Sequence, residues 1–111
     1  MQNPYVRLAV QSYTHYLDTG KIMKMPEGLP EEMTGRRAGA FVTLYKHGSL
    51  RGCIGTISPV RDSLAEEIIM NALSAAFRDP RFPPVQAEEL PDLVCSVDVL
   101  DAPEPISDTG A

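Results

Sequence analysis

The chain has 111 residues, which is the length of one ordinary domain with a single hydrophobic core. Apolar residues make up 43% of the sequence, a share well above that of chains that stay disordered. The net charge of −5 opposes a phosphate backbone, and Arg36-Arg37 is the only close basic pair, so nucleic acid is not an expected partner. No apolar run approaches the ~20 residues that cross a bilayer, and the first residues lack a signal-peptide pattern. We therefore expect no membrane contact and, by default, a cytoplasmic location.

The two cysteines predict neither a disulfide nor a metal centre. Cys53 and Cys95 are far apart in the sequence, and a cytoplasmic compartment argues against their oxidation. The sequence holds no CxxC or HxxxH spacing, and its only histidines are His15 and His47. We therefore expect no bound metal and identify no cofactor.

A first helix is predicted over residues 4–19. Asn3 can cap this helix, a proline follows in the first turn, and apolar residues then recur at helical spacing until Gly20, which is placed to end it. Residues 21–38 are predicted to form a linker or lid, because prolines and a glycine interrupt regular structure there, with one short turn opening at Pro30.

Two strands joined by a turn are predicted next. Residues 40–45 are rich in β-forming side chains and apolar on both faces, which is typical of a central strand. His47-Gly48 supplies the turn, and residues 50–57 return as a second strand.

The following segment predicts an amphipathic helix that stops at Asp79-Pro80. Asp62 or Ser63 caps it, and Ser63 with Glu66 matches the capping-box pattern. Its apolar residues form one stripe that faces the core. The residues predicted to lie mostly on the opposite side are Glu66, Glu67, Met70, Asn71 and Ser74.

The last predicted elements are a short turn at 86–90 and a strand at 94–100. Alternation with a period of two places Cys95, Val97 and Val99 on one face of this strand. Three strands leave at least one sheet edge unpaired, which a complete domain would normally cover. We therefore interpret the chain as a fragment and expect that an exposed sheet edge allows self-association.

The first candidate site lies on the second strand. Alternation directs Leu50 to the core and leaves Arg51 and Cys53 together on the other face, beside the gap left by Gly55. A cationic neighbour favours thiolate, the nucleophilic form of cysteine, so Cys53 is the candidate nucleophile and Arg51 its electrostatic partner. Gly52 and Gly55 weaken a strand, and their presence predicts a bulge or a close approach of another part of the backbone.

The second candidate cluster is Asp-Pro-Arg-Phe-Pro-Pro, residues 79–84. The prolines stiffen the backbone, and the planar fork of Arg81 suits a carboxylate or phosphate. Each cluster also has a purely structural explanation. Cys53 can pack as a small hydrophobic residue, while Arg81 can pair with Asp79 and Phe82 can fill the core.

Three segments in order carry a resemblance to a known family: residues 39–44 (GAFVTL), 50–56 (LRGCIGT) and 75–84 (AAFRDPRFPP). Together with the intervening helix and the final strand at 96–100, they resemble the AMMECR-type domain family, whose bacterial members are also called AmmeMemoRadiSam system protein A. The resemblance implies an α+β fold with a mainly antiparallel, partly barrel-like sheet flanked by helices. Residues 1–111 are thus interpreted as a single AMMECR-like domain that lacks the family's C-terminal portion.

The resemblance also implies that the motif positions share one surface. Strand geometry and the family association together make Cys53 and Arg51 the candidate catalytic residues. The positions expected to bind substrate are Gly52, Gly55, Thr56, Asp79, Arg81 and Phe82. The family name implies association with a Memo-like protein and a radical SAM protein, but supplies no reaction. The function expected is a catalytic or substrate-presenting component beside such chemistry. The alternative is a non-catalytic protein-binding or scaffolding module.

Overall fold

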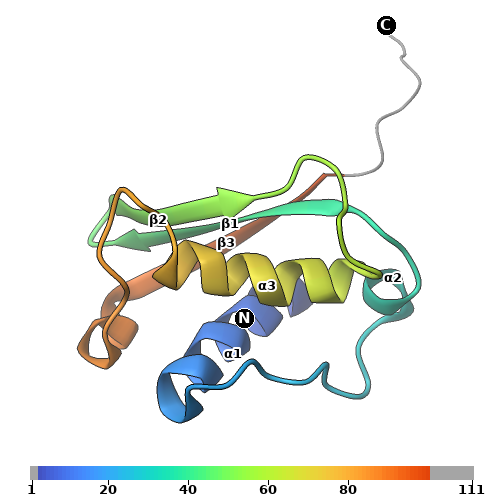
Figure 1. Cartoon of the computed structure of the whole chain (residues 1–111), viewed down its shortest axis with the longest axis horizontal. Helices are drawn as coiled ribbons and strands as arrows, with labels where there is room; N and C mark the ends of the chain where they lie inside the picture. The colour runs from blue at the N-terminus through green and yellow to red at the C-terminus, as the bar shows by residue number, and fades with distance from the viewer. Residues whose placement is uncertain (1–2, 101–111) are drawn as a thin grey trace, which may run out of the picture.

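A computed structural model of the chain describes residues 3–100 and shows an α+β fold, in which two helices lie against one face of a three-stranded sheet (Figure 1). The helices are α1 (Pro4–Thr19), the short α2 (Glu31–Thr34) and α3 (Leu64–Phe77), followed by the 3-10 helix η1 (Ala87–Asp92). The strands are β1 (Gly39–Lys46), β2 (Ser49–Gly55) and β3 (Leu93–Leu100).

The sheet is antiparallel with the strand order β2-β1-β3, so β1 is the central strand, as predicted. A two-residue turn joins β1 to β2, and its residues His47 and Gly48 have φ values of 52° and 81°. Positive φ at both turn positions is the geometry whose twist matches that of the flanking strands. The expectation of a partly barrel-like sheet is wrong for the described residues, because three strands in an open order do not close on themselves.

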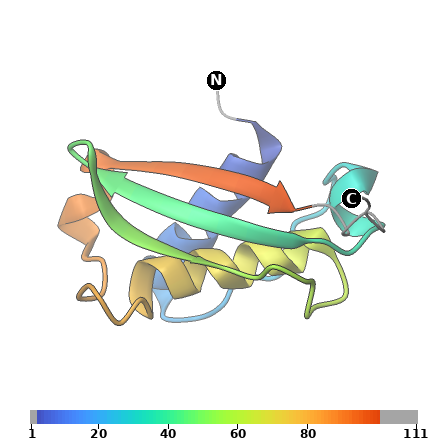
Figure 2. The same ribbon diagram turned by 90° about the horizontal axis from the view of Figure 1, so that it is seen from above.

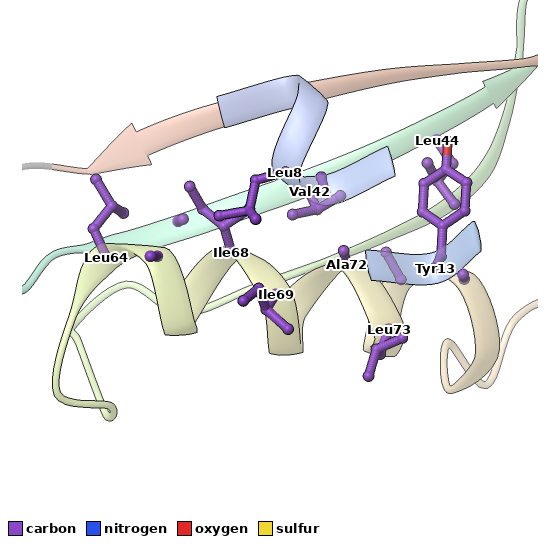
Figure 3. Close-up of a cluster of buried hydrophobic side chains, with 14 of the residues drawn as sticks. Leu8, Tyr13, Val42, Leu44, Leu64, Ile68, Ile69, Ala72 and Leu73 are labelled. Carbon is purple, nitrogen blue, oxygen red and sulfur yellow. The ribbon is translucent and has the colours of Figure 1, made fainter. Parts of the chain in front are cut away.

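Helices α1 and α3 cover one face of the sheet, and Figure 2 looks onto the other face, over which no helix of the described residues lies. The buried side chains of α1, α3 and β1 interlock between the layers, as Figure 3 shows for Leu8, Ile68 and Val42. Each of these three side chains is at most 1% exposed. Among residues 3–100, no helix combines the length and the apolar character needed to span a membrane.

The ends of α1 follow from its sequence, and the predicted bounds are confirmed. The side chain of Asn3 accepts a hydrogen bond from the backbone N–H of Val6, which satisfies one of the free donors of the first turn. Gly20 ends the helix in the left-handed region at φ 74°, and its N–H donates to the carbonyl of Tyr16. The short turn predicted after Pro30 is present as α2.

Helix α3 is more deeply buried than its apolar stripe predicts. Ser63 caps it as expected, by accepting from the N–H of Glu66. However, Glu67 and Asn71, predicted on the polar side, are 0% and 2% exposed. The Asn71 amide donates to the carbonyl of Ala40, and the Glu67 carboxylate binds the loop that precedes the helix. The prediction failed because buried polar residues with complete hydrogen bonding have the same sequence pattern as exposed ones.

Strand β3 has the predicted alternation. Its register with β1 places Cys95 opposite Leu44, Val97 opposite Val42 and Val99 opposite Ala40, three β1 residues with no exposed surface. Cys95, Val97 and Val99 therefore share the helix-covered face. Cys95 is half-buried and packs against the core, and this burial raises the pKa of its thiol to about 12.

Candidate functional site

A β-bulge shapes the strand that carries the first motif. The register shifts between Leu44, which pairs with Gly52, and Tyr45, which pairs with Leu50, so that Arg51 is the inserted residue. The bulge reverses the facing predicted for the start of β2: Leu50 pairs with a residue of the uncovered face and is 39% exposed. The prediction that Leu50 packs in the core is wrong, because strict alternation does not hold across a bulge.

Arg51 forms a bidentate ion pair with Glu89 of η1, with its Nε and Nη2 2.8 and 3.0 Å from the two carboxylate oxygens. Lys46 binds the same carboxylate at 3.1 Å. Lys46 lies two residues after the buried Leu44 on β1, so both side chains lie on the same face of the sheet. The Glu89 carboxylate is therefore on the helix-covered side. The hydrogen bonds from Arg51 lower the pKa of Glu89 to about 2. The charge of Arg51 is thus directed to Glu89 and away from the face that bears Cys53.

Cys53 lies on the uncovered face of the sheet, opposite Thr43 of β1. Its side chain is half-buried, and its Sγ is 3.2 Å from the hydroxyl oxygen of Thr43, in a hydrogen bond in which either atom can be the donor. Thr43 is also paired with Ser96 of β3, so the row across the sheet reads Cys53, Thr43, Ser96. The thiol is therefore held at one edge of a polar row that no helix of the described residues covers.

The second motif holds the backbone of Cys53 from outside the sheet. The Asp79 carboxylate accepts from the backbone N–H of Cys53 at 3.1 Å, and Nη2 of Arg81 donates to the Cys53 carbonyl at 3.3 Å. An edge strand would otherwise use this backbone N–H and carbonyl to pair with another strand. Residues Asp79 and Arg81 thus close the outer edge of β2 at Cys53, and the predicted shared surface of the two motifs is a direct contact.

Asp79 and Arg81 are also bound to each other. Nε and Nη2 of Arg81 lie 3.0 and 2.7 Å from the two carboxylate oxygens of Asp79, which is only 4% exposed. These hydrogen bonds hold the pKa of Asp79 well below its usual range. The Arg81 guanidinium lies 5.5 Å from the centre of the Phe82 ring. The pairing of Asp79 with Arg81 is thus the one predicted for a purely structural role of this motif. The second part of that prediction is wrong, because Phe82 is half-buried beside Arg81 and is not part of the core.

Packing accounts for both glycines of the first motif. A Cβ on Gly52 would lie 2.2 Å from the carbonyl oxygen of Ala75 in α3, so β2 and α3 touch backbone to backbone. A Cβ on Gly55 would lie 2.4 Å from Cγ of Phe41, whose ring covers that position. The bulge and the close backbone approach predicted for these glycines are both present.

Thr56 takes part in a different cluster from Cys53. Its hydroxyl donates to the Glu67 carboxylate at 2.8 Å and accepts from the Asn71 amide at 3.2 Å. These contacts lie on the helix-covered side, where α3 approaches the end of β2. The structure thus brings Cys53, Asp79 and Arg81 together, and separates them from Arg51 and Thr56.

Three side chains in these networks were not identified from the sequence. Glu89 lies in a segment predicted only as a turn, and Thr43 looks like an ordinary strand residue. Glu67 has the spacing of a solvent-exposed residue. Of these three, only Glu89 had a signal in the sequence, because a cation such as Arg51 close to a predicted core needs a carboxylate partner.

Neither a histidine nor a metal-type cluster adjoins the thiol. No hydrogen bond joins Cys53 to a histidine within residues 3–100, and His47 pairs with Asp92 at 3.5 Å near the β1–β2 turn. That part of the chain holds no group of three or more His, Cys, Asp or Glu side chains arranged to bind a metal ion. The chemistry that these residues offer is that of a thiol with a neighbouring hydroxyl.

Comparison with known proteins places this arrangement in context. A family model described as AMMECR1 matches residues 6–110. A protein of Thermotoga maritima is 53% identical over 108 residues, which are 96% of this chain and 62% of that protein. A protein of Methanothermobacter thermautotrophicus is 46% identical, over 91% of this chain and 52% of that protein.

The fold has a counterpart among solved structures. The crystal structure of an uncharacterized protein, PH0010 from Pyrococcus horikoshii, has a TM-score of 0.81 and 42% identity, and the match covers 86% of this chain and 48% of that one. The chain thus spans less than two thirds of the length of the relatives that it matches here.

Proposed function

We propose, since this chain belongs to the AMMECR1 family, that it presents Cys53 as the reactive group of a cysteine-centred site. In this proposal the chain is a substrate-presenting component, with catalytic participation through the thiol, that acts beside a Memo-like protein and radical SAM chemistry. The observation that carries it is the position of the thiol on the uncovered sheet face, with the Cys53 backbone fixed by Asp79 and Arg81.

The charges around the thiol favour presentation over complete catalysis. Arg51 is bound to Glu89, and Arg81 is bound to Asp79, so both cations of the two motifs already have carboxylate partners. The hydrogen-bond partner of the Cys53 thiol is a neutral hydroxyl, that of Thr43. The Arg81 guanidinium also interacts electrostatically with Cys53, but its direct ion pair is with Asp79. A partner protein would then supply the acid–base groups that a thiol needs for covalent chemistry.

A non-catalytic binding module is the alternative, and one observation favours it. Next to the row of Cys53 on the same face, Leu50, Tyr45 and Val94 pair across the three strands and are 39%, 39% and 64% exposed. Aromatic and aliphatic side chains gathered on a rigid sheet are typical of protein-binding surfaces.

Labelling with iodoacetamide in a Cys95→Ala background tests the proposal. We expect Cys53 to be alkylated in the native protein at a rate within about tenfold of a free thiol, because its side chain is half-buried on an uncovered face. Labelling only on unfolding would contradict the proposal.

Copurification with a Memo-like protein separates the two functions. The presenting role predicts that Cys53→Ser keeps the complex but loses product formation. The binding module predicts that Val94→Asp abolishes the complex, while Cys53→Ser changes neither binding nor activity.

The same edge geometry supports a proposal on self-association. Asp79 and Arg81 close the outer edge of β2 at Cys53, whereas the outer edge of β3 has no partner strand among residues 3–100. Pairing of two copies would therefore use β3. Light scattering that finds one monomeric species at all concentrations would contradict it.

A further inference from the structure

The loop between β2 and α3, residues 56–61, is held rigidly by a buried carboxylate. Glu67 is fully buried, and its oxygens accept from the Thr56 hydroxyl at 2.8 Å and from the N–H groups of Val60 and Arg61, each at 3.1 Å. The Arg61 guanidinium completes the set at 2.7 Å. A buried charge is tolerated only when its hydrogen bonds are satisfied, and here four donors from one loop satisfy it.

A second side chain, that of Arg37, also binds this loop. The guanidinium of Arg37 donates to the carbonyl of Arg61 at 3.0 Å and to that of Pro59 at 3.3 Å. The loop nevertheless displays Ile57 and Val60 to solvent, at 74% and 63% exposure. Exposed apolar side chains on a fixed backbone lose little conformational entropy on binding, which is the property of an interface anchor.

The loop borders a pocket of about 540 Å³, whose other lining residues come mostly from the segment after α1 and from the first half of α3. Its apolar lining consists of Ile22, Met23, Met25, Val60, Ile69 and Met70. Ile22 and Met25 are themselves 48% and 37% exposed. Methionine side chains adapt to differently shaped apolar ligands, which suits a surface that receives another protein segment.

The rim of the pocket carries an excess of negative charge. Asp62 and Glu66 line it, and among residues 3–100 neither forms an ion pair with a cation. Glu66 lies in the first turn of α3, and Asp62 directly precedes Ser63, the residue that caps this helix. Arg61 is neutralised by Glu67, which leaves Lys24 as the opposing charge on the rim.

We propose that this pocket docks an amphipathic helix of a partner protein whose apolar side chains enter between Met25 and Val60, and whose basic flank faces Asp62 and Glu66. The surface is distinct from the uncovered sheet face that bears Cys53. The net charge of −5 adds to the attraction for a cationic segment. Helix-in-groove binding of this kind uses apolar anchors at helical spacing.

An amphipathic helical peptide of leucine and lysine, titrated into the whole chain carrying carbon-13 methionine methyl groups, tests the proposal. We expect the signals of Met23, Met25 and Met70 to shift, while that of the fully buried Met33 stays in place. A leucine–glutamate peptide should bind at least about tenfold more weakly, because its charges repel the rim.

Matched variants locate the binding. Val60→Asp should weaken binding by about tenfold or more, while Val94→Asp, at a residue of nearly equal exposure on the sheet face, should leave it within about twofold. Cys53→Ser should also leave it unchanged, so failure of the cysteine site and failure of this pocket are distinguishable. Equal weakening by the two aspartate variants would overturn the proposal. So would shifts at these methionines on raising the concentration of the chain alone, which would mean that a second copy occupies the pocket.

Discussion

Replacing Gly52 by alanine tests whether the glycine of the first motif serves packing. The hydrogen that points at α3 would become a methyl group 2.2 Å from the carbonyl oxygen of Ala75. Nonbonded carbon and oxygen atoms require about 1 Å more than that. The obstacle is helix backbone, which cannot rotate away as a side chain could.

The cost follows from what fixes α3 at this point. Ala75 and Ala76 are 1% and 2% exposed, and the Ala76 carbonyl also accepts from the N–H of Val85. Relief of the clash must therefore separate the helix from the sheet over a closely packed contact. Overpacking of this kind costs roughly 1–3 kcal/mol, and a rigid obstacle places Gly52→Ala near 3 kcal/mol.

Urea unfolding followed by circular dichroism measures the loss. Gly48→Ala is the control, because Gly48 has a φ of 81° but no atom within 4 Å of an added Cβ. Its strain alone is worth about 1 kcal/mol. If Gly52→Ala lost no more stability than Gly48→Ala, the backbone contact between β2 and α3 would not be tight, and this explanation of the glycine would be refuted.

Three further results are expected. The ion pair with Arg51 lowers the pKa of Glu89 from 4.5 to about 2, so its contribution to the stability of the fold is complete above pH 4.5 and is lost as the pH falls towards 2. Glu89→Gln should flatten the pH dependence of the free energy of unfolding in that window and, since solvent screens the pair, cost roughly 1–2 kcal/mol at neutral pH. The control Glu88→Gln, at an exposed residue, should have neither effect. Glu67→Gln should lower the free energy of unfolding by roughly 2–4 kcal/mol, because one carboxylate oxygen with its charge is lost from a buried four-donor site, and Glu66→Gln, on the next residue, should cost well under half of that. Since burial raises the pKa of the Cys95 thiol to about 12, iodoacetamide should label Cys95 much more slowly in the native protein than in the unfolded one. Equal labelling rates for the native and the unfolded Cys53→Ser protein would contradict this effect of burial.

Local sequence signals predicted the elements of the fold. The cap at Asn3, the αL position of Gly20 and the two-residue turn at His47-Gly48 each act within a few residues, so each can be recognised without tertiary information. Strand alternation likewise predicted the buried face of β3. The barrel-like sheet, expected from resemblance alone, has no such local signal and is absent from residues 3–100.

The site was only partly predictable because its contacts join distant segments. Arg51 and Glu89 are 38 residues apart, and the Cys53 backbone meets Asp79 across 26 residues. The sequence indicated that both motifs share a surface, but it could not assign partners within that surface. The bulge at Arg51 then reversed the facing of this residue, which changed a predicted neighbour of the thiol into the partner of Glu89.

The motif residues differ in how fully the fold explains them. Gly52 makes room for α3, Arg51 ties β2 to η1, and Asp79 with Arg81 closes the edge of β2. The fold alone therefore gives each of these residues a structural role. The Cys53 backbone is equally constrained, yet within residues 3–100 its side chain forms one hydrogen bond, with Thr43, and alanine or serine would fit the same position on the uncovered face. Packing therefore explains why a small residue stands there but not why it is a thiol, and that difference makes Cys53 the motif residue at which a chemical role is best sought.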